Sequence, residues 1–404
     1  MMTLSYGQAG SSAVPFLLIS TSVEANGMGG IMTTANSSSP TSMMFNPAHL
    51  GISSQTEFFS TETFSRKTQW LPQFGLSDLW INNYSMMYGV RFSGENSPNI
   101  SVGIGYSRVF LNLGKFIVTS ELGPEPTATF DGYETSDNFC IGVGIDFGVT
   151  LAFGSTIKKI TSQLSPIGTA QERPANSGKA WASDLGLIVK FPLFSLIKKE
   201  YEHRLHTLTP FFDITTAYAL NNVGGRISYL DAAQSDPLPR TARLGWGAET
   251  GLHYRSEQID VPLITLTIAR EAENLLFQRA NNGSWNYDGL PLGNIDIYKN
   301  LIASKADGYI SVRRGFSVNV FETATFRQGS FEGDGNLSYQ TSGFSISTRG
   351  FSKIISSSLP ADTGFNPIEF FFMHLEIRYS HSEYSGRSPL NGTSFDNLIF
   401  TFHH

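Results

Sequence analysis

The sequence has little cysteine and little charge. Its 404 residues include one cysteine, Cys140, so an intrachain disulfide and a cysteine metal cluster are both excluded. Charged residues make up 15% of the chain, against about 25% in a typical soluble protein, and the net charge is −6. No long basic run is present, so the sequence does not support a nucleic-acid-binding surface.

Long apolar runs are also missing. No stretch of about eighteen apolar residues occurs, which excludes a transmembrane helix. It does not exclude a transmembrane β-barrel, because barrel strands carry an apolar residue only at every second position. The start, "MMTLSYGQAG", lacks the basic and apolar regions of a complete signal peptide. We expect it to be the tail of a removed or missing signal peptide; the alternative is a protein that is not secreted.

The sequence does have long segments in which apolar and polar residues alternate with a period of two. In Thr241–Arg255 the even positions are mostly apolar or aromatic, and the odd positions are glycine or charged. Because a strand places successive side chains on opposite faces, this pattern predicts a long strand with one apolar and one polar face. The same alternation occurs in residues 84–93, 100–107 and 139–146.

About thirteen such segments and one weaker one follow residue 55, each about ten to sixteen residues long. This length suits a tilted crossing of a bilayer. Short connections are expected at 146–148 and 95–98, and long ones at 162–179, 222–238, 273–307 and 384–394. The pattern predicts an all-β fold, a transmembrane antiparallel β-barrel of about 14 strands.

The polar face of these segments consists mainly of Gly, Ser, Thr and Ala. Small side chains suit a crowded lumen, whereas the apolar face would contact acyl chains. The alternative is a large soluble β-sandwich or propeller in which the apolar face forms the core, although no internal repeat supports a propeller. Charged residues on the polar face of the 241–255 segment are candidate lumen residues: Arg243, Glu249, His253 and Arg255.

The first 52 residues show no alternation and are rich in Ser, Gly, Met and Ala. We therefore divide the chain into an N-terminal segment and plug, residues 1–52, and a barrel, residues 53–404. Glycines here allow close backbone packing or a positive φ, and Asn-Pro favours a turn. The candidate plug residues are Pro15, Phe16, Leu17, Leu18, Ile19, Gly27, Gly29, Asn46 and Pro47.

Motifs for catalysis or cofactor binding are weak. "GMGG" is not followed by the GK[ST] of a phosphate loop, and no GxSxG is present. "DAAQSD" at 231–236 lacks the spacing and the glutamate of an EF-hand, which leaves a weak calcium site as its only metal interpretation. We expect no catalytic residues, no cofactor and no metal.

Several blocks resemble the PorV-type outer-membrane proteins of the type IX secretion system, in the PorV/PorQ group. These are "AVPFLLISTSVEANGMGG", "FNPAHLG", "YSRVFLNLGKF", "AWASDLGLIVKFP" and "YALNNVGGRISYLDAAQSDPLPRTARLG", in an order that covers most of the chain. Residues 273–307 and the "FETATFRQGSFEGDGNLSYQTSGFSIS" stretch depart from the family pattern.

The resemblance implies a FadL-like barrel with an N-terminal plug, located in the bacterial outer membrane. It implies a non-enzymatic role in binding secreted cargo at the translocon and delivering it to a surface attachment complex. The partners would be a large translocon barrel, cargo C-terminal β-domains, the attachment complex and outer-membrane lipid. The alternative functions are a FadL-like transporter of hydrophobic small molecules and, less favoured, an outer-membrane enzyme.

Overall fold

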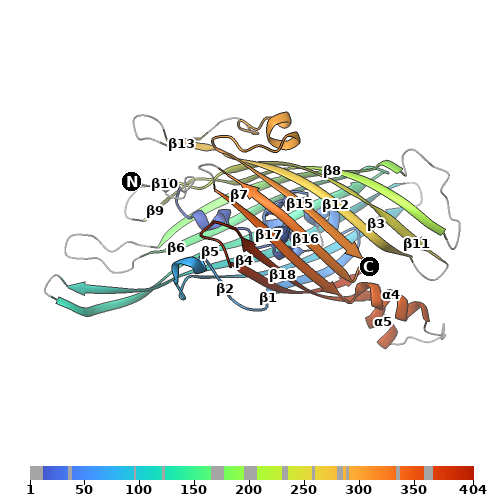
Figure 1. Cartoon of the computed structure of the whole chain (residues 1–404), viewed down its shortest axis with the longest axis horizontal. Helices are drawn as coiled ribbons and strands as arrows, with labels where there is room; N and C mark the ends of the chain where they lie inside the picture. Colours follow the sequence, from blue (N-terminus) through green and yellow to red (C-terminus); the bar gives the residue numbers. More distant parts are fainter. Residues whose placement is uncertain are drawn as a thin grey trace.

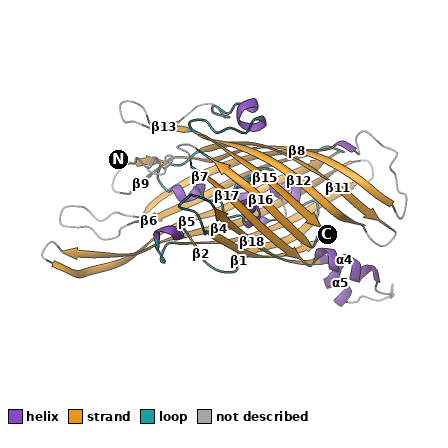
Figure 2. Ribbon diagram, in the orientation of Figure 1, coloured by secondary structure: helices purple, strands orange, loops and turns teal. Residues whose placement is uncertain are grey.

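The computed structural model describes residues 12–34, 39–94, 97–120, 123–164, 177–194, 207–229, 235–256, 260–279, 285–287, 291–333, 337–358 and 367–404. These residues form a closed antiparallel barrel of 14 strands with an N-terminal segment inside it (Figure 1). Figure 2 shows that nearly all of the wall is strand, and that the helices lie in the lumen or at the two ends. Among the described residues, no helix is both long and apolar enough to cross a bilayer.

The barrel strands follow one another around the wall, and the first strand closes the ring by pairing with both the last strand and the second barrel strand. All pairings are antiparallel, and because the ring is closed no strand of the wall is left with a free edge over its whole length. The strands are β1 (Glu57–Phe64), β3 (Trp80–Gly94), β4 (Ser97–Ser120), β5 (Gly123–Asp146), β6 (Thr150–Gln163), β7 (Gly178–Pro192), β8 (Thr207–Gly224), β11 (Thr241–Arg255), β12 (Asp260–Leu275), β15 (Ile310–Val320), β16 (Ala324–Glu332), β17 (Ser338–Ser347), β18 (Leu375–Ser385) and β19 (Ser394–His403).

The outside of the wall is apolar at mid-height. Phe139, Phe153 and Trp181 are 55%, 53% and 60% exposed, while their strand neighbours Cys140 and Ala152 are buried. Large apolar side chains exposed on this scale around a closed wall fit hydrocarbon rather than water. The lipid-facing belt consists of Tyr84, Met86, Tyr88, Phe92, Ile100, Ile104, Phe139, Ile141, Phe153, Ile157, Trp181, Leu185, Ile264, Leu266, Ile268, Phe316, Phe326, Phe344, Ile346, Ile377 and Phe400. The transmembrane barrel predicted from the alternation is therefore confirmed, and the soluble sandwich is not the fold.

The connections differ between the two ends of the barrel. The predicted short connections at 95–98 and 146–148 both lie at one end, which also holds the start of β1 and the end of β19. The four predicted long connections lie at the other end. The loops at this end, including the 65–79 connection between β1 and β3, contain β2 (Thr68–Gln69), η3 (Pro72–Phe74), β9 (Arg226–Ser228), β10 (Ser235–Pro237), β13 (Phe277–Arg279), β14 (Trp285–Tyr287) and η4 (Ile297–Ile302).

The predicted strand lengths are wrong for some strands. β1 has 8 residues, whereas β4 and β5 have 24 each. The register explains the excess, because β4 pairs with β3 only as far as Asn112 and β5 pairs with β6 only from Tyr133. The remainder is a two-stranded ribbon that extends past the long-loop end (Figure 1).

The apolar face of β11 also departs from the prediction. Leu252 is exposed on the outer face, but Leu244 and Trp246 pack against Ile295, Leu301 and neighbouring residues instead of lipid. The loop between β12 and β15 folds over the outside of the wall, and Arg270 on β12 donates to the carbonyl of Ile302. The two side chains point outward as predicted, and a loop rather than lipid covers them.

Candidate functional site

The N-terminal segment fills the lumen. It enters near β10, where the Ala13 amide donates to the Pro237 carbonyl over 3.1 Å, and leaves at the opposite end into β1. Its elements are short: η1 (Pro15–Leu18), α1 (Val23–Gly27), η2 (Pro40–Met44) and α2 (His49–Ser53). The first of them starts with proline at its first position, and Ser22 caps α1 by accepting from the Ala25 amide.

Glycines on the inner face of the wall form a seat for the plug. A Cβ on Gly154 would lie 2.2 Å from the Pro47 carbonyl carbon, and one on Gly186 would lie 2.0 Å from Asn46 Oδ1. Both distances are shorter than real Cβ contacts, so glycine at these two positions allows the Pro47 backbone and the Asn46 side chain to come this close. The small residues of the polar face are thus required by the packing of the plug.

A polar junction at the same place joins three segments far apart in sequence. Asn46 accepts from the Ala48 amide over 3.1 Å and donates to the Thr33 carbonyl over 3.3 Å. Asn221 on β8 donates to the Phe45 carbonyl over 2.9 Å. Behind them, the buried Lys158–Asp184 ion pair spans 2.8 Å, and Asp184 also accepts from the Asn222 amide over 2.7 Å. Residues of the "FNPAHLG", "ASDLG" and "NNVGG" blocks therefore make one junction between plug and wall.

A second contact between plug and wall is charged. Glu271 Oε2 on β12 accepts from the amides of Met32 and Thr33 and from the Thr33 hydroxyl, over 2.8–2.9 Å. Its other oxygen lies 3.5 Å from Arg243 and 3.6 Å from Arg313, and both arginines also pair with Glu273. All four charged side chains are buried, and their formal charges sum to zero. We call Arg243, Glu271, Glu273 and Arg313 the lumen charge cluster.

Further bonds hold the plug along β16 to β19. Glu24 accepts from Ser380 over 2.7 Å, and Tyr384 donates to Asn26 over 2.8 Å. The Gly29 amide donates to the Thr341 hydroxyl over 2.8 Å. Gly29 has a φ of +76°, and a Cβ there would lie 2.6 Å from the Ser330 carbonyl oxygen, so the turn after α1 needs glycine.

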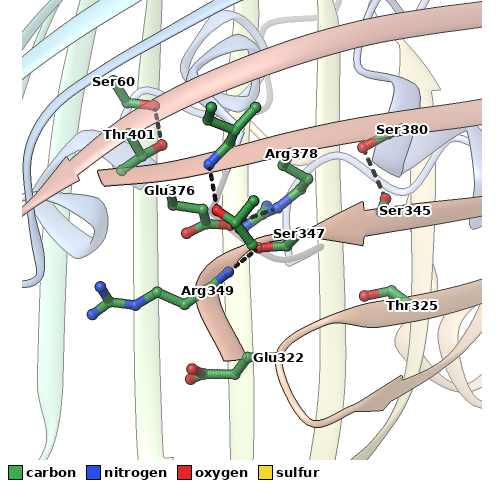
Figure 3. Close-up of polar contacts among 12 residues, drawn as sticks. Ser60, Glu322, Thr325, Ser345, Ser347, Arg349, Glu376, Arg378, Ser380 and Thr401 are labelled. Carbon is green, nitrogen blue, oxygen red and sulfur yellow. Dashed lines mark hydrogen bonds and ion pairs between the residues drawn. The ribbon is translucent and has the colours of Figure 1, made fainter. Parts of the chain in front are cut away.

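Towards the short-turn end, the lumen wall carries a polar row (Figure 3). Ser347 donates to Glu376 over 2.8 Å, Glu376 also binds Arg378, and Ser345 donates to Ser380 over 2.8 Å. This row and the plug contacts described above line the inner face of the described wall with polar groups. The plug fills the lumen that they surround.

An apolar pocket lies above the plug at the long-loop end. It has a volume of about 440 Å³, and plug, barrel wall and loops all contribute to it. Glu273 and Arg313 of the lumen charge cluster lie in its lining, together with Tyr309, Tyr339 and Tyr384. The apolar lining consists of Pro15, Phe16, Leu18, Ile19, Met32, Trp70, Leu71, Leu111, Leu275, Phe331, Leu337, Pro389 and Leu390.

The candidate residues from the sequence divide among these sites. Of residues 15–19, all but Leu17 line the pocket, and Leu17 packs against the apolar core beside it. Gly27 packs its backbone against Arg327 and Gly343, while Gly29, Asn46 and Pro47 make the contacts described above. The structure brings these plug residues into contact with the wall. Sequence reasoning missed Glu271, Glu273 and Arg313, although their polar-face positions on β12 and β15 were a usable signal.

The candidate lumen residues of β11 do not form one group. Arg243 belongs to the lumen charge cluster. Glu249 is half-buried and accepts from Thr267 over 3.5 Å. His253 and Arg255 lie beside the β11–β12 turn, where both bind Asp260; His253 is half-buried and Arg255 is exposed. Two other sequence motifs fall wholly or mostly outside the described residues: the proposed signal remnant and most of the 231–236 calcium candidate.

The buried plug residue His49 predicts a pH effect. Its Nε2 lies 3.2 Å from the Met32 carbonyl oxygen, and burial lowers its pKa from 6.5 to about 4. Because the folded-state pKa is depressed, protonation of His49 favours the unfolded chain. The free energy of unfolding is therefore at its full value, as far as this group is concerned, above about pH 6.5, and it falls as the pH drops towards 4. Acidification over this range should therefore lower the stability of the wild type more than that of His49→Gln, by up to about 1.4 kcal/mol per pH unit.

Thermal unfolding in detergent between pH 7.5 and 4.5 measures this effect. The His253→Gln variant, at a half-buried position outside the plug, is the matched control and should follow the wild-type pH profile. A His49→Gln profile parallel to that of the wild type would contradict the assignment.

The chain matches no protein-family model and no curated protein sequence. Its structure is similar to that of the toluene transporter TodX from Pseudomonas putida, with 9% identity, 94% of this chain and 97% of that chain covered, and a TM-score of 0.41. It is also similar to OccK9 from Pseudomonas aeruginosa, with 7% identity, 86% and 97% coverage and a TM-score of 0.32. CdiB from Acinetobacter baumannii shows 6% identity, 86% and 60% coverage and a TM-score of 0.34.

Proposed function

We propose that this chain is a barrel of the bacterial outer membrane that captures hydrophobic small molecules at its long-loop end. The observation behind this proposal is the 440 Å³ apolar pocket, to which plug, wall and loops all contribute. Its size and its lining, mostly apolar with a few convergent polar groups, are those of small-molecule sites. In outer-membrane barrels the longer loops face the outside of the cell, so the pocket would meet ligands arriving from there.

The charges beside the pocket favour an uncharged ligand. Arg313 lies in the lining, but Glu271 and Glu273 already neutralise it together with Arg243. An incoming carboxylate would lose its hydration without gaining an unpaired cation. Tyr384 already donates to Asn26, and the other two tyrosines in the lining, Tyr309 and Tyr339, can hydrogen-bond a hydroxyl or a carbonyl of a neutral guest. The proposed ligand class is therefore neutral and predominantly apolar.

A binding experiment tests the pocket. The neutral fluorophore N-phenyl-1-naphthylamine should bind the purified protein, and Leu18→Glu should weaken its binding at least about tenfold, because the change removes apolar contact and adds a charge. Leu76→Glu, at an exposed loop position outside the pocket, is the control and should leave binding unchanged. The anionic probe cis-parinaric acid should bind more weakly than its methyl ester. Equal affinity of wild type and Leu18→Glu would reject the pocket as the binding site.

The second candidate is the cargo-binding role in type IX secretion that the PorV resemblance implies. The observation that favours it is the meeting of three resembling blocks at one plug–wall junction, at Asn46, Asp184 and Asn222. The three blocks that carry the resemblance thus contribute to the contact between plug and wall. The proposed partners are the translocon barrel, cargo C-terminal β-domains and the surface attachment complex, reached through the loops or the outer wall.

Affinity purification from native membranes separates the two candidates. Co-purification of a very large barrel or of C-terminal β-domains supports the secretion role, and their absence opposes it. Deletion of residues 15–19 tests the plug: cargo association or barrel integrity should fail. Unchanged secretion with unchanged folding would exclude these five residues from that role.

A further inference from the structure

Two helices between β17 and β18 lie outside the wall at the short-turn end (Figure 1). They are α4 (Arg349–Ser358) and α5 (Pro367–His374), and they contact each other and the barrel strands beside them. We call this pair the helical foot. No function discussed above uses it.

Several apolar side chains of the foot are exposed. On α4, Phe351, Ile354 and Ile355 share one helix face by their spacing and are exposed, Phe351 by 59%, while Ser352 is buried. On α5, Phe371 and Met373 are 54% and 49% exposed. A helix lying in water on a globular protein does the opposite and buries its apolar face.

An apolar cleft separates α5 from the seam between the first and last strands. Its volume is about 500 Å³. The Phe371 and Phe402 ring centroids lie 6.2 Å apart across an edge-on contact. The lining consists of Phe58, Phe59, Phe370, His374, Phe402, His403 and His404.

The cleft continues into the lipid-facing belt. Phe58 packs edge-on against Tyr88 at 4.8 Å, and Tyr88 belongs to that belt. Ile377 on β18 and Phe400 on β19 also belong to the belt, and they are cross-strand neighbours close to the end of α5. The exposed face of the foot therefore extends a surface that already meets hydrocarbon.

Polar contacts fix the foot in this orientation. Arg349 donates through Nη1 to the Met373 carbonyl over 3.1 Å, which ties α4 to α5, and its amide donates to Ser347 over 3.0 Å. Lys353 pairs with Glu322 over 2.6 Å. In Figure 3 the Arg349 side chain extends away from the Ser347–Glu376 contact. Cationic side chains beside an apolar helix face are typical of helices at a membrane interface.

We propose that the helical foot binds the lipid leaflet at the short-turn end, which is the periplasmic leaflet in outer-membrane barrels, and that its cleft holds a phospholipid acyl chain. The continuity with the lipid-facing belt favours lipid over a protein partner. This inference depends on the transmembrane placement of the barrel and not on the ligand pocket.

Spin-label accessibility tests the proposal. Cys140 is replaced by serine, and single cysteines are labelled at Ile355 and Phe371, in vesicles of phosphatidylethanolamine and phosphatidylglycerol. Ile141→Cys in the belt is the lipid reference, and Ser77→Cys in an exposed loop is the water reference. Labels on the foot should match Ile141, with high collision rates with oxygen and low rates with a water-soluble nickel chelate. Nickel collision rates equal to those at Ser77 would overturn the proposal and leave the foot as a site for a periplasmic protein.

Photolabelling of the unaltered protein keeps the test independent of variant folding. A phospholipid with a diazirine in its acyl chain should label the 367–374 peptide as strongly as the 139–145 peptide of β5. Labelling of the strands without the foot would contradict the proposal.

Discussion

Glu271→Ala should release the plug from the wall. The change removes the acceptor for the amides of Met32 and Thr33 and for the Thr33 hydroxyl, and it leaves two buried arginines with one carboxylate. Removing one partner of a buried ion cluster lowers the free energy of unfolding by about 3–5 kcal/mol, because an uncompensated buried charge remains. Hydrogen exchange of the Met32 and Thr33 amides should accelerate more than about a hundredfold, and conductance in planar bilayers should rise.

Glu249→Ala is the matched control for this prediction. It removes a carboxylate from the neighbouring strand, where the described contact is a single long bond from Thr267. It should change neither exchange nor conductance. Unchanged exchange at Met32 and Thr33 in Glu271→Ala would show that the glycine seat holds the plug without the lumen charge cluster.

Gly154→Val should prevent the plug from seating. Its first added carbon would lie 2.2 Å and 2.3 Å from the Pro47 carbonyl carbon and oxygen, and it is backbone rather than a flexible side chain that would have to move. Overpacking of this kind lowers the free energy of unfolding by about 1–3 kcal/mol, and by more where the neighbouring backbone cannot move aside. We expect a lower unfolding temperature and proteolysis within residues 43–54.

The control is Gly225→Val, at a loop position where an added Cβ has nothing within 4 Å. It should unfold and be cleaved like the wild type. If Gly154→Val also behaves like the wild type, the plug is not held against β6 in the way described.

Much of the wall could be predicted because its signal is local. The alternation in Thr241–Arg255 assigns Arg243 to one face and Leu252 to the other, and the structure has them buried in the lumen and exposed on the outside. Parity along a strand needs no knowledge of the neighbouring strand. The structure has the four predicted long connections at one barrel end and the two predicted short ones at the other, because each strand crosses the wall once, but the helical foot adds a long connection at the short-turn end.

Partners across the lumen could not be predicted in this way. That Glu271 meets both Arg243 and Thr33 depends on the register of β11 and β12 and on the path of the plug. The covering of Trp246 depends on where the 291–306 loop folds, which alternation does not encode. The helical foot was not predicted either. Its helical signal consists of only three apolar residues, at 351, 354 and 355, and an alternation of period two does not detect that spacing.

By itself the sequence determined the class of fold, the inward or outward side of most strand residues, and an N-terminal segment distinct from the wall. These depend on composition and on neighbours along the chain. Only the tertiary structure decided that Gly154 and Gly186 seat Asn46 and Pro47, that four charges from three strands balance in the lumen, and that an apolar pocket remains above the plug. These features join residues of the plug and of different strands, and their energies arise only once the barrel has closed around the plug.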